Sequence, residues 1–133
     1  MRTVLMMILA GATIACGGSV NAPSDAVGKI WRLVSIQEGD APPTSVQNSS
    51  RYTLRLEDGG RVSVMSDCNS CGGTYTLDGS ALELQGLACT RVGCGDGSLD
   101  PAYARALEGT KTATIDDEDL VISGNGVTLR FGR

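Results

Sequence analysis

Apolar and polar residues alternate along most of the chain beyond residue 27, which is the pattern of strands that bury one face. Short sequences rich in Gly, Asp and Asn separate these runs and predict three hairpins, with turns at residues 57–60, 78–80 and 124–126. A less regular run at residues 30–34 predicts a first strand in which Trp31 is buried. The polar stretch 37–50 shows no period and predicts a loop. We therefore expect a mainly β domain.

A single segment, at about residues 100–108, has helical rather than strand periodicity. Tyr103 and Leu107 lie four positions apart and would share the face that packs on the sheet. Asp100 suits the N-cap, and Gly109 suits the left-handed residue that follows a last helical turn. We expect one helix packed against the strands.

The first residues have the features of an export signal. One basic residue, Arg2, precedes an uncharged run over residues 3–15, which has the length of a signal-peptide core rather than of a membrane span. Residues 13–16 resemble a bacterial lipobox, in which cleavage precedes Cys16 and a diacylglyceryl group is attached to its sulfur. Ordinary cleavage, with Cys16 left as a free thiol, is the alternative.

Lipidation of Cys16 would divide the chain into a signal peptide (1–15), a lipidated flexible tether (16–26) and a folded domain (27–133). Two or three acyl chains hold a protein durably at a membrane, because each buried methylene contributes about 0.8 kcal/mol. No aspartate follows Cys16, which resembles the sorting pattern of outer-membrane lipoproteins. The expected location is the cell envelope, on the periplasmic face of the outer membrane if the host is Gram-negative.

The composition narrows the possible functions. Of 133 residues, 15 are acidic and 11 basic, and removal of residues 1–15 makes the net charge about −5, which argues against nucleic acid as a partner. The chain has no histidine, which is the usual general base and the commonest metal ligand. It also has no glycine-rich phosphate loop and no nucleophile elbow. The sequence therefore predicts neither an enzyme nor a resident cofactor.

The other four cysteines lie close together in the sequence, at Cys68, Cys71, Cys89 and Cys94. If the turn at residues 78–80 sets the register, residues whose numbers sum to about 157–160 lie opposite one another. Cys71 then lies near Cys89, and Cys68 approaches Cys94 if a bulge absorbs the remaining offset. These nested pairs are the preferred choice among the three connectivities that four cysteines allow. Each disulfide would contribute about 3 kcal/mol to a small domain with few aromatic residues.

Three other uses of this region stay open. Four thiolates at this spacing would suit zinc, although an exported, oxidising location favours disulfides. Cys68 and Cys71 would suit a thioredoxin-like redox pair, which requires a reactive thiolate at a helix N-terminus. The spacing of a calcium loop is also present, at Asp67, Asn69, Gly72 and Asp78. Its last position lacks the usual bidentate glutamate.

Three spaced motifs connect the chain with a known family. They are W-x-L at Trp31 and Leu33, C-N-x-x-x-G-x-Y at Cys68, Asn69, Gly73 and Tyr75, and L-A-x-T-x-x-x-C at Leu87, Ala88, Thr90 and Cys94. With these motifs the chain resembles, from about residue 27 to residue 131, the META domain, the HslJ-like group of small bacterial lipoproteins and envelope proteins. Asp67 departs from the glycine that often precedes the C-N pair, and Cys71 and Cys89 are additional to the family pattern.

The resemblance implies a compact antiparallel, cracked β-barrel of about seven to eight strands with one helix, similar to the pilotin lipoproteins, and an apolar cavity. It also implies that Cys68 and Cys94 are the pair shared with the family, which leaves Cys71 and Cys89 to pair with each other. The motif residues would be structural: Trp31, Asn69, Gly73, Tyr75 and Thr90. Among them, Asn69 would tie a turn, Gly73 would allow a close backbone approach, and Tyr75 would lie in the core.

The family is associated with heat or envelope stress and has no established catalytic reaction. The resemblance therefore implies a non-enzymatic, lipid-anchored envelope protein that serves as a stress-related binding module. Its partner would be an envelope protein or an apolar, lipid-like small ligand. A thiol, redox or metal-binding protein that uses the four clustered cysteines is the alternative.

Overall fold

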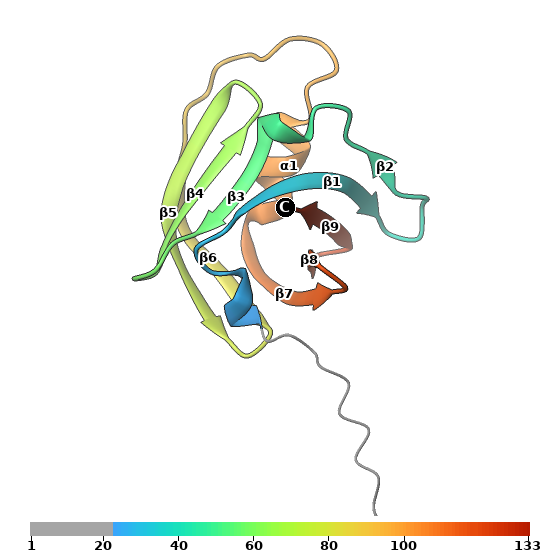
Figure 1. Ribbon diagram of the computed structural model, residues 1–133. Helices are drawn as coiled ribbons and strands as arrows, with labels where there is room; N and C mark the ends of the chain where they lie inside the picture. The colour runs from blue at the N-terminus through green and yellow to red at the C-terminus, as the bar shows by residue number, and fades with distance from the viewer. Residues whose placement is uncertain (1–22) are drawn as a thin grey trace, which may run out of the picture.

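The computed structural model describes residues 23–133 (Figure 1). Its strands are β1 (Ile30–Glu38), β2 (Thr44–Ser45), β3 (Tyr52–Leu56), β4 (Arg61–Ser66), β5 (Asn69–Asp78), β6 (Ala81–Cys89), β7 (Gly109–Asp116), β8 (Asp119–Gly124) and β9 (Val127–Gly132). The helix α1 comprises Asp100–Leu107, and two 3₁₀ turns, η1 (Pro23–Ala26) and η2 (Ser49–Arg51), precede β1 and β3. The predicted signal peptide, the lipidation site Cys16 and residues 16–22 of the predicted tether lie outside the described residues.

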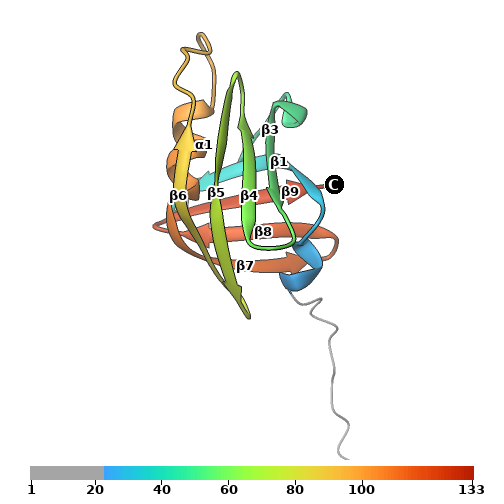
Figure 2. The same cartoon turned by 90° about the vertical axis from the view of Figure 1, so that its left-hand side faces the viewer.

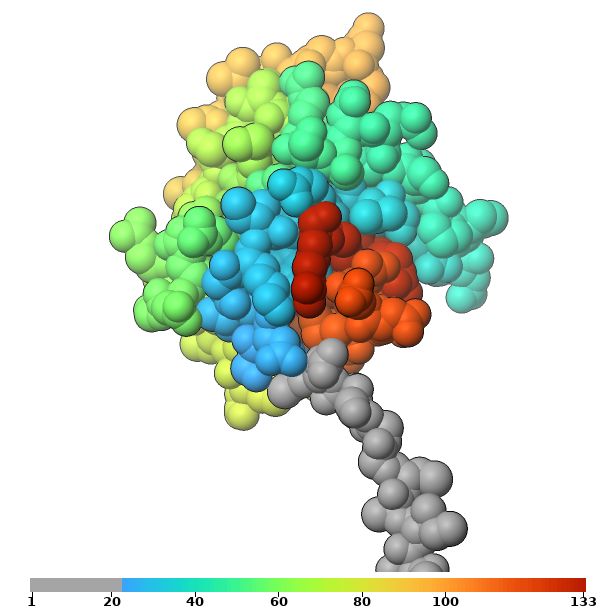
Figure 3. Space-filling view, in the orientation of Figure 1, coloured from blue at the N-terminus to red at the C-terminus, as the bar shows by residue number. Residues whose placement is uncertain are grey.

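Eight strands form an antiparallel barrel, which β1 closes by pairing with two neighbours. Residues 30–32 of β1 pair with β3, whereas residues 32–38 pair with β9. The other strands follow in chain order, and the two-residue β2 adds only to the edge of β1. Figure 2 shows β3–β6 running across the direction of β1 and β7–β9, and Figure 3 shows the C-terminal residues packed beside β1. The predicted antiparallel barrel with one helix is confirmed.

The ladder between β6 and β7 is incomplete. Only residues 81–84 of β6 pair with β7, whereas residues 85–89 pair with β5 alone. Part of α1 faces this unpaired half of β6 across a surface cleft. The barrel is nevertheless closed, because residues 81–84 of β6 pair with β7 and β1 pairs with β9, so the cracked barrel that the resemblance implies is replaced by a closed one.

Large apolar side chains fill the barrel. The largest fully buried ones are Trp31, Tyr103, Phe131, Leu33, Leu54, Leu56, Leu82, Leu107, Leu120, Ile122, Leu129 and Val62. Tyr103 projects from α1 and packs edge-on against Tyr52, with the ring centroids 5.9 Å apart. Each such side chain contributes about 1.5–3 kcal/mol on burial. Because this cluster occupies the interior, the structure differs here from the apolar cavity that the resemblance implies.

The folded domain begins earlier than the predicted boundary at residue 27. Pro23–Ala26 form η1, and Ala26 is only 1% exposed. The indole nitrogen of the buried Trp31 donates a hydrogen bond to the Ala26 carbonyl oxygen over 2.8 Å. This bond fixes η1 against the barrel, so residues 23–26 belong to the domain rather than to a flexible tether.

Helix α1 differs from the prediction at its N-terminus. Leu99 takes the N-cap position and Asp100 is already helical, so the prediction that Asp100 caps the helix is wrong. The Asp100 amide instead donates to the Ser98 hydroxyl over 3.2 Å. Gly109, with φ 83°, has the left-handed conformation expected after the last turn. Within residues 23–133, no helix has the length and apolar character needed to cross a bilayer.

Candidate functional site

Three segments meet at the end of the barrel that lies uppermost in Figure 1. They are the turn between β4 and β5, the loop over residues 90–99, and the segment from β2 to η2. At the turn, Asp67 has φ 58°, a left-handed conformation that favours glycine and that a short polar side chain also tolerates. This conformation explains why aspartate can stand where the family often has glycine.

One disulfide joins two of these segments to each other, and another joins the neighbouring strands β5 and β6. Cys71 and Cys89 lie directly opposite each other on β5 and β6, and a second bond joins Cys68 to Cys94. These are the pairs that the sequence favours, and the register irregularity between residues 72 and 74 brings Cys71 opposite Cys89. All four thiols are joined, so zinc or redox chemistry here would first need reduction. The calcium-loop interpretation is wrong, because residues 69–78 form a strand.

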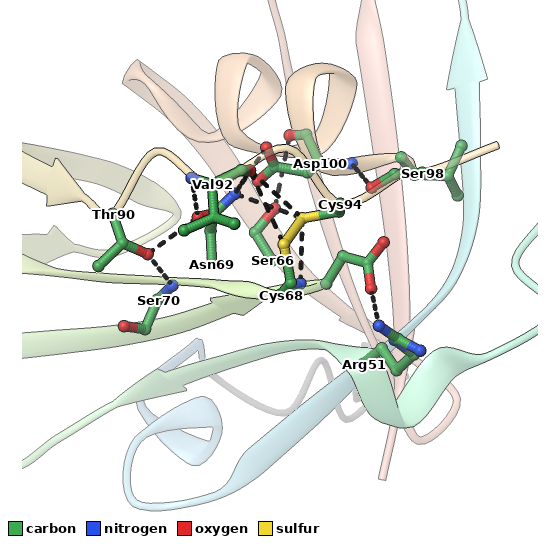
Figure 4. Close-up of a disulfide and its surroundings, with 12 residues drawn as sticks. Arg51, Ser66, Cys68, Asn69, Ser70, Thr90, Val92, Cys94, Ser98 and Asp100 are labelled. Atoms are coloured by element: carbon green, nitrogen blue, oxygen red, sulfur yellow. Dashed lines mark hydrogen bonds and ion pairs between the residues drawn. A yellow bond between two sulfur atoms is a disulfide. The ribbon is translucent and has the colours of Figure 1, made fainter. Parts of the chain in front are cut away.

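Asn69 connects the start of β5 to the loop before α1 (Figure 4). Its side-chain nitrogen donates to the Val92 carbonyl oxygen (2.9 Å) and to Oδ2 of Asp100 (3.1 Å). Its side-chain oxygen accepts from the Val92 amide (2.8 Å) and from the Thr90 hydroxyl (3.0 Å). The residue is only 2% exposed. Both ends of the amide are satisfied within the protein, which is the arrangement of a structural tie rather than of a ligand-binding group.

Two other motif residues shape the β5–β6 pair. A Cβ atom on Gly73 would lie 2.7 Å from the carbonyl oxygen of Gln85 and 3.2 Å from Cα of Leu87, so only glycine fits this crossing. Tyr75 is partly rather than fully buried, which corrects its expected place in the core. Its hydroxyl donates to the Glu57 carbonyl oxygen over 2.8 Å, and burial raises the pKa of the phenol above its ordinary value. Both residues act on the architecture.

A cleft of about 320 Å³ opens beside this disulfide-bonded rim, and we call it the rim cleft. Residues 44–48 form one wall, and residues 94 and 96–99 form the other. Arg51, Tyr52 and Asp67 lie between the two walls. Because Cys94 belongs to one wall, the bond that holds the loop to the β4–β5 turn also holds the shape of the cleft.

The floor of the rim cleft is a hydrogen-bonded network around Asp67, whose side chain is 8% exposed. Its Oδ2 accepts from the Tyr52 hydroxyl (3.3 Å), which in turn accepts from the Leu99 amide (2.9 Å). Its Oδ1 forms an ion pair with Nη2 of Arg51 at 2.5 Å but accepts no hydrogen bond of good geometry. A hydrogen bond from Ser98, assisted by the Arg51 charge, lowers the pKa of Asp67 against the opposing effect of burial.

The rim cleft suits non-covalent recognition. The side chain of Arg51 is about half exposed, and the residues that line the cleft with it include hydroxyl and amide side chains. Within residues 23–133, no group of three or more His, Cys, Asp or Glu side chains is arranged to hold a metal. Sequence reasoning missed Arg51, Tyr52 and Ser98 as site residues, because Ser98 is more than forty residues from the adjacent pair Arg51 and Tyr52. In the sequence, Asp67 stood out as a departure from the family's glycine and as the first position of the candidate calcium loop, but not as part of a cleft.

Comparisons with known proteins place the fold. Residues 24–133 match the sequence signature described as the META domain. A protein from Burkholderia xenovorans, solved by NMR, is similar with a TM-score of 0.69 and 22% identity over 96% of this chain and 98% of its own. A lipocalin-like protein from Bacteroides uniformis has a TM-score of 0.53 and 20% identity over 82% of this chain and 98% of its own. No match was found among curated proteins.

Proposed function

The chain belongs to the META domain family, and from that membership we propose that it is a lipid-anchored protein of the cell envelope that acts by binding a partner and not by catalysis. A META domain on a closed barrel fits a binding module. In this proposal the lipidated Cys16 holds the protein on the periplasmic face of the outer membrane in a Gram-negative host. The stress-related role that the family resemblance implies would follow from the identity of the partner.

The observation that carries the proposal is the preorganised floor of the rim cleft. Hydrogen bonds already fix Tyr52 and Asp67, and the Cys68–Cys94 disulfide holds one wall. A partner would therefore lose little free energy in ordering the site. Binding residues are commonly found on loops that a rigid scaffold holds in place, as they are here.

A polar segment of a protein partner suits this cleft better than a lipid-like ligand. The core side chains fill the barrel interior, and the cleft floor carries the charges of Arg51 and Asp67. An acyl chain placed there would remove water from both charged groups and could not replace the hydrogen bonds that they make to that water. The volume lies near the lower end of the roughly 300–1,000 Å³ typical of ligand sites, so it would accept one or two side chains of a peptide.

The position of η1, where the folded domain starts, is consistent with a rim cleft that faces away from the membrane. Figures 1 and 2 place η1 at the end of the barrel opposite the loop over residues 90–99. Cys16 precedes Pro23 by seven positions, which span at most about 25 Å when fully extended. A lipid on Cys16 would keep η1 close to the bilayer and direct the rim cleft away from it.

The anchor is tested by expressing the full-length chain and its Cys16→Ser variant in a Gram-negative host. We expect the wild type in the membrane fraction, with the mass of a diacylglyceryl-modified chain that begins at Cys16. The variant should be released with the soluble periplasm. An unmodified wild-type chain in the soluble fraction would contradict lipid anchoring without affecting the binding proposal.

Binding is tested with a photo-crosslinking residue placed at Gln47, on the wall of the rim cleft. The control is the same residue at Thr114, an exposed position of β7. We expect a discrete adduct from position 47 that is absent from position 114 and that Arg51→Met reduces. Equal crosslinking at both positions, or none at either, would mean that the rim cleft is not the binding surface.

A further inference from the structure

A second pocket lies beside α1, at the side of the barrel opposite β3. Helix α1, the end of β1 and the turn between β8 and β9 surround it, and these elements lie together on the left of Figure 2. Its volume is about 340 Å³. We call it the lysine pocket, because Lys111 of β7 lines it.

Lys111 points toward the barrel interior. Its neighbours Thr110 and Thr112 are exposed, whereas Lys111 and Ala113 are buried, which is the alternation of a strand with one inward face. The lysine is only 4% exposed. A Cβ atom on Gly124 would lie 2.6 Å from Cδ of Lys111, so the glycine in β8 makes room for the lysine stem.

The ammonium group of Lys111 has no partner within residues 23–133. The ion pairs found there involve Arg51 and Arg130, and no side-chain hydrogen bond includes Lys111. Glu38 and Glu108 line the same pocket, but both are exposed and neither carboxylate lies within 4.0 Å of the ammonium nitrogen. The Lys111 nitrogen is not among the fully buried polar atoms that lack a partner, so its charge meets the solvent inside the pocket, where an anion that entered would pair with it.

We propose that the lysine pocket binds a small organic monocarboxylate, with its carboxylate on Lys111 and its apolar body against α1. Ala102 and Ala106 of the helix and Val127 of β9 supply the apolar wall. The volume suits a compact acid and falls short of a long acyl chain, because the core occupies the barrel interior. This site is separate from the rim cleft, and its existence does not depend on the function proposed there.

The acidic residues around the pocket select a single negative charge. The side chains that line the pocket include two acidic ones, Glu38 and Glu108, and two basic ones, Arg105 and Lys111. The pocket therefore has no excess of positive charge. A dianion such as inorganic phosphate would gain from Lys111 but would be repelled by both carboxylates. A monocarboxylate places its one charge at the lysine and its uncharged end against the apolar wall, so it brings no second charge into the pocket.

The proposal is tested by calorimetric titration of hexanoate into the full-length chain that carries Cys16→Ser. The chain has two lysines, so Lys29→Met is a matched control for Lys111→Met. We expect Lys111→Met to weaken hexanoate binding at least about tenfold, and Lys29→Met to leave it unchanged. Hexanamide and inorganic phosphate should bind more weakly than hexanoate. Equal binding to both lysine variants, tighter binding of phosphate, or no binding to the folded chain would overturn the proposal.

A second measurement uses the chain that retains Lys111 and so does not depend on whether the Lys111→Met variant folds. Amine acetylation of the Lys111-containing chain, followed by peptide mass spectrometry, reports both lysines in one sample. Hexanoate should slow the labelling of Lys111 several-fold while the labelling of Lys29 stays constant, and hexanamide should slow neither. Unchanged labelling of Lys111 at saturating hexanoate would place the ligand elsewhere.

Discussion

The β5–β6 hairpin and the β7–β8–β9 meander belong to the same barrel but are held together differently. The hairpin carries the Cys71–Cys89 disulfide and the buried Asn69, and the loop that follows it is tied down by the Asn69 side chain and by the Cys68–Cys94 disulfide. In the meander, consecutive strands pair along most of their length, and its notable side-chain link is a surface clamp in which Arg130 binds Asp116 and Asp119 at 2.6 and 2.8 Å.

The difference shows where a small barrel needs covalent help. The meander has a continuous ladder, so its backbone groups are satisfied by the sheet itself. The upper half of β6 lacks a second neighbour, and residues 90–99 belong to no strand. Here the Cys68–Cys94 disulfide and the hydrogen bonds of the Asn69 side chain hold the chain in place where no strand pairing does so. The same reinforcement shapes the rim cleft, so stability and the proposed binding site share one set of contacts.

Loss of both disulfides should produce the largest effect. The bonds close segments with sequence separations of 26 and 18, and each contributes about 3 kcal/mol, less the overlap between nested loops. Urea unfolding of the Cys16→Ser chain should therefore show a fall of at least about 3 kcal/mol when a reductant is added. Equal unfolding free energies with and without reductant would remove the distinction between the two regions.

Peptide mapping without reduction sharpens the same test. It should recover Cys68 joined to Cys94 and Cys71 joined to Cys89, with no free thiol among these four. Another connectivity would refute the hairpin register as the cause of pairing. Four free thiols, or bound zinc by native mass spectrometry, would instead favour the alternative function in thiol or metal chemistry.

Replacement of Asn69 by alanine should have the next largest effect. The variant leaves the Val92 amide and the Asp100 carboxylate without the part-buried hydrogen bonds that Asn69 makes to them, which costs about 2–3 kcal/mol. Thr90→Val removes a smaller part of the network and should cost about 1 kcal/mol. Urea unfolding measures both values. Trypsin should also cut faster after the exposed Arg91 in Asn69→Ala, and an unchanged cutting rate would show that Asn69 does not hold the loop.

The sequence predicts the hairpins and the cysteine pairing because both depend on local information. Period-2 alternation and the turn at residues 78–80 determine the β5–β6 register without reference to the rest of the chain. The length of β1 is different, because most of its second half is paired with β9, about a hundred residues away, and the two-residue β2 adds only a short second ladder. The rim cleft and the inward position of Lys111 also depend on closure of the barrel, which brings distant segments together. Neither could therefore be located from the sequence.

Loss of the Arg130 clamp should have a small effect. Its three side chains are between 37% and 59% exposed, and exposed ion pairs contribute about 0.2–1 kcal/mol each. Arg130→Met should therefore lower the unfolding free energy by about 1 kcal/mol or less, and added salt should reduce the difference. A loss as large as that for Asn69→Ala would show that the meander also depends on side-chain ties.

The smallest expected effect is a pH dependence at the rim. Because the folded state lowers the pKa of Asp67 below its ordinary value of 3.8, ionised Asp67 stabilises the fold at neutral pH, and this stabilisation is lost as the pH falls below about 4. The unfolding free energy of Asp67→Asn should therefore fall less steeply than that of the wild type between pH 6 and pH 3. Ser98→Ala and Arg51→Met should each reproduce part of this change, since both side chains contribute to the lowered pKa. Identical acid slopes for the wild type and Asp67→Asn would mean that the floor of the rim cleft forms without the charge of Asp67, and that the disulfide alone determines its shape.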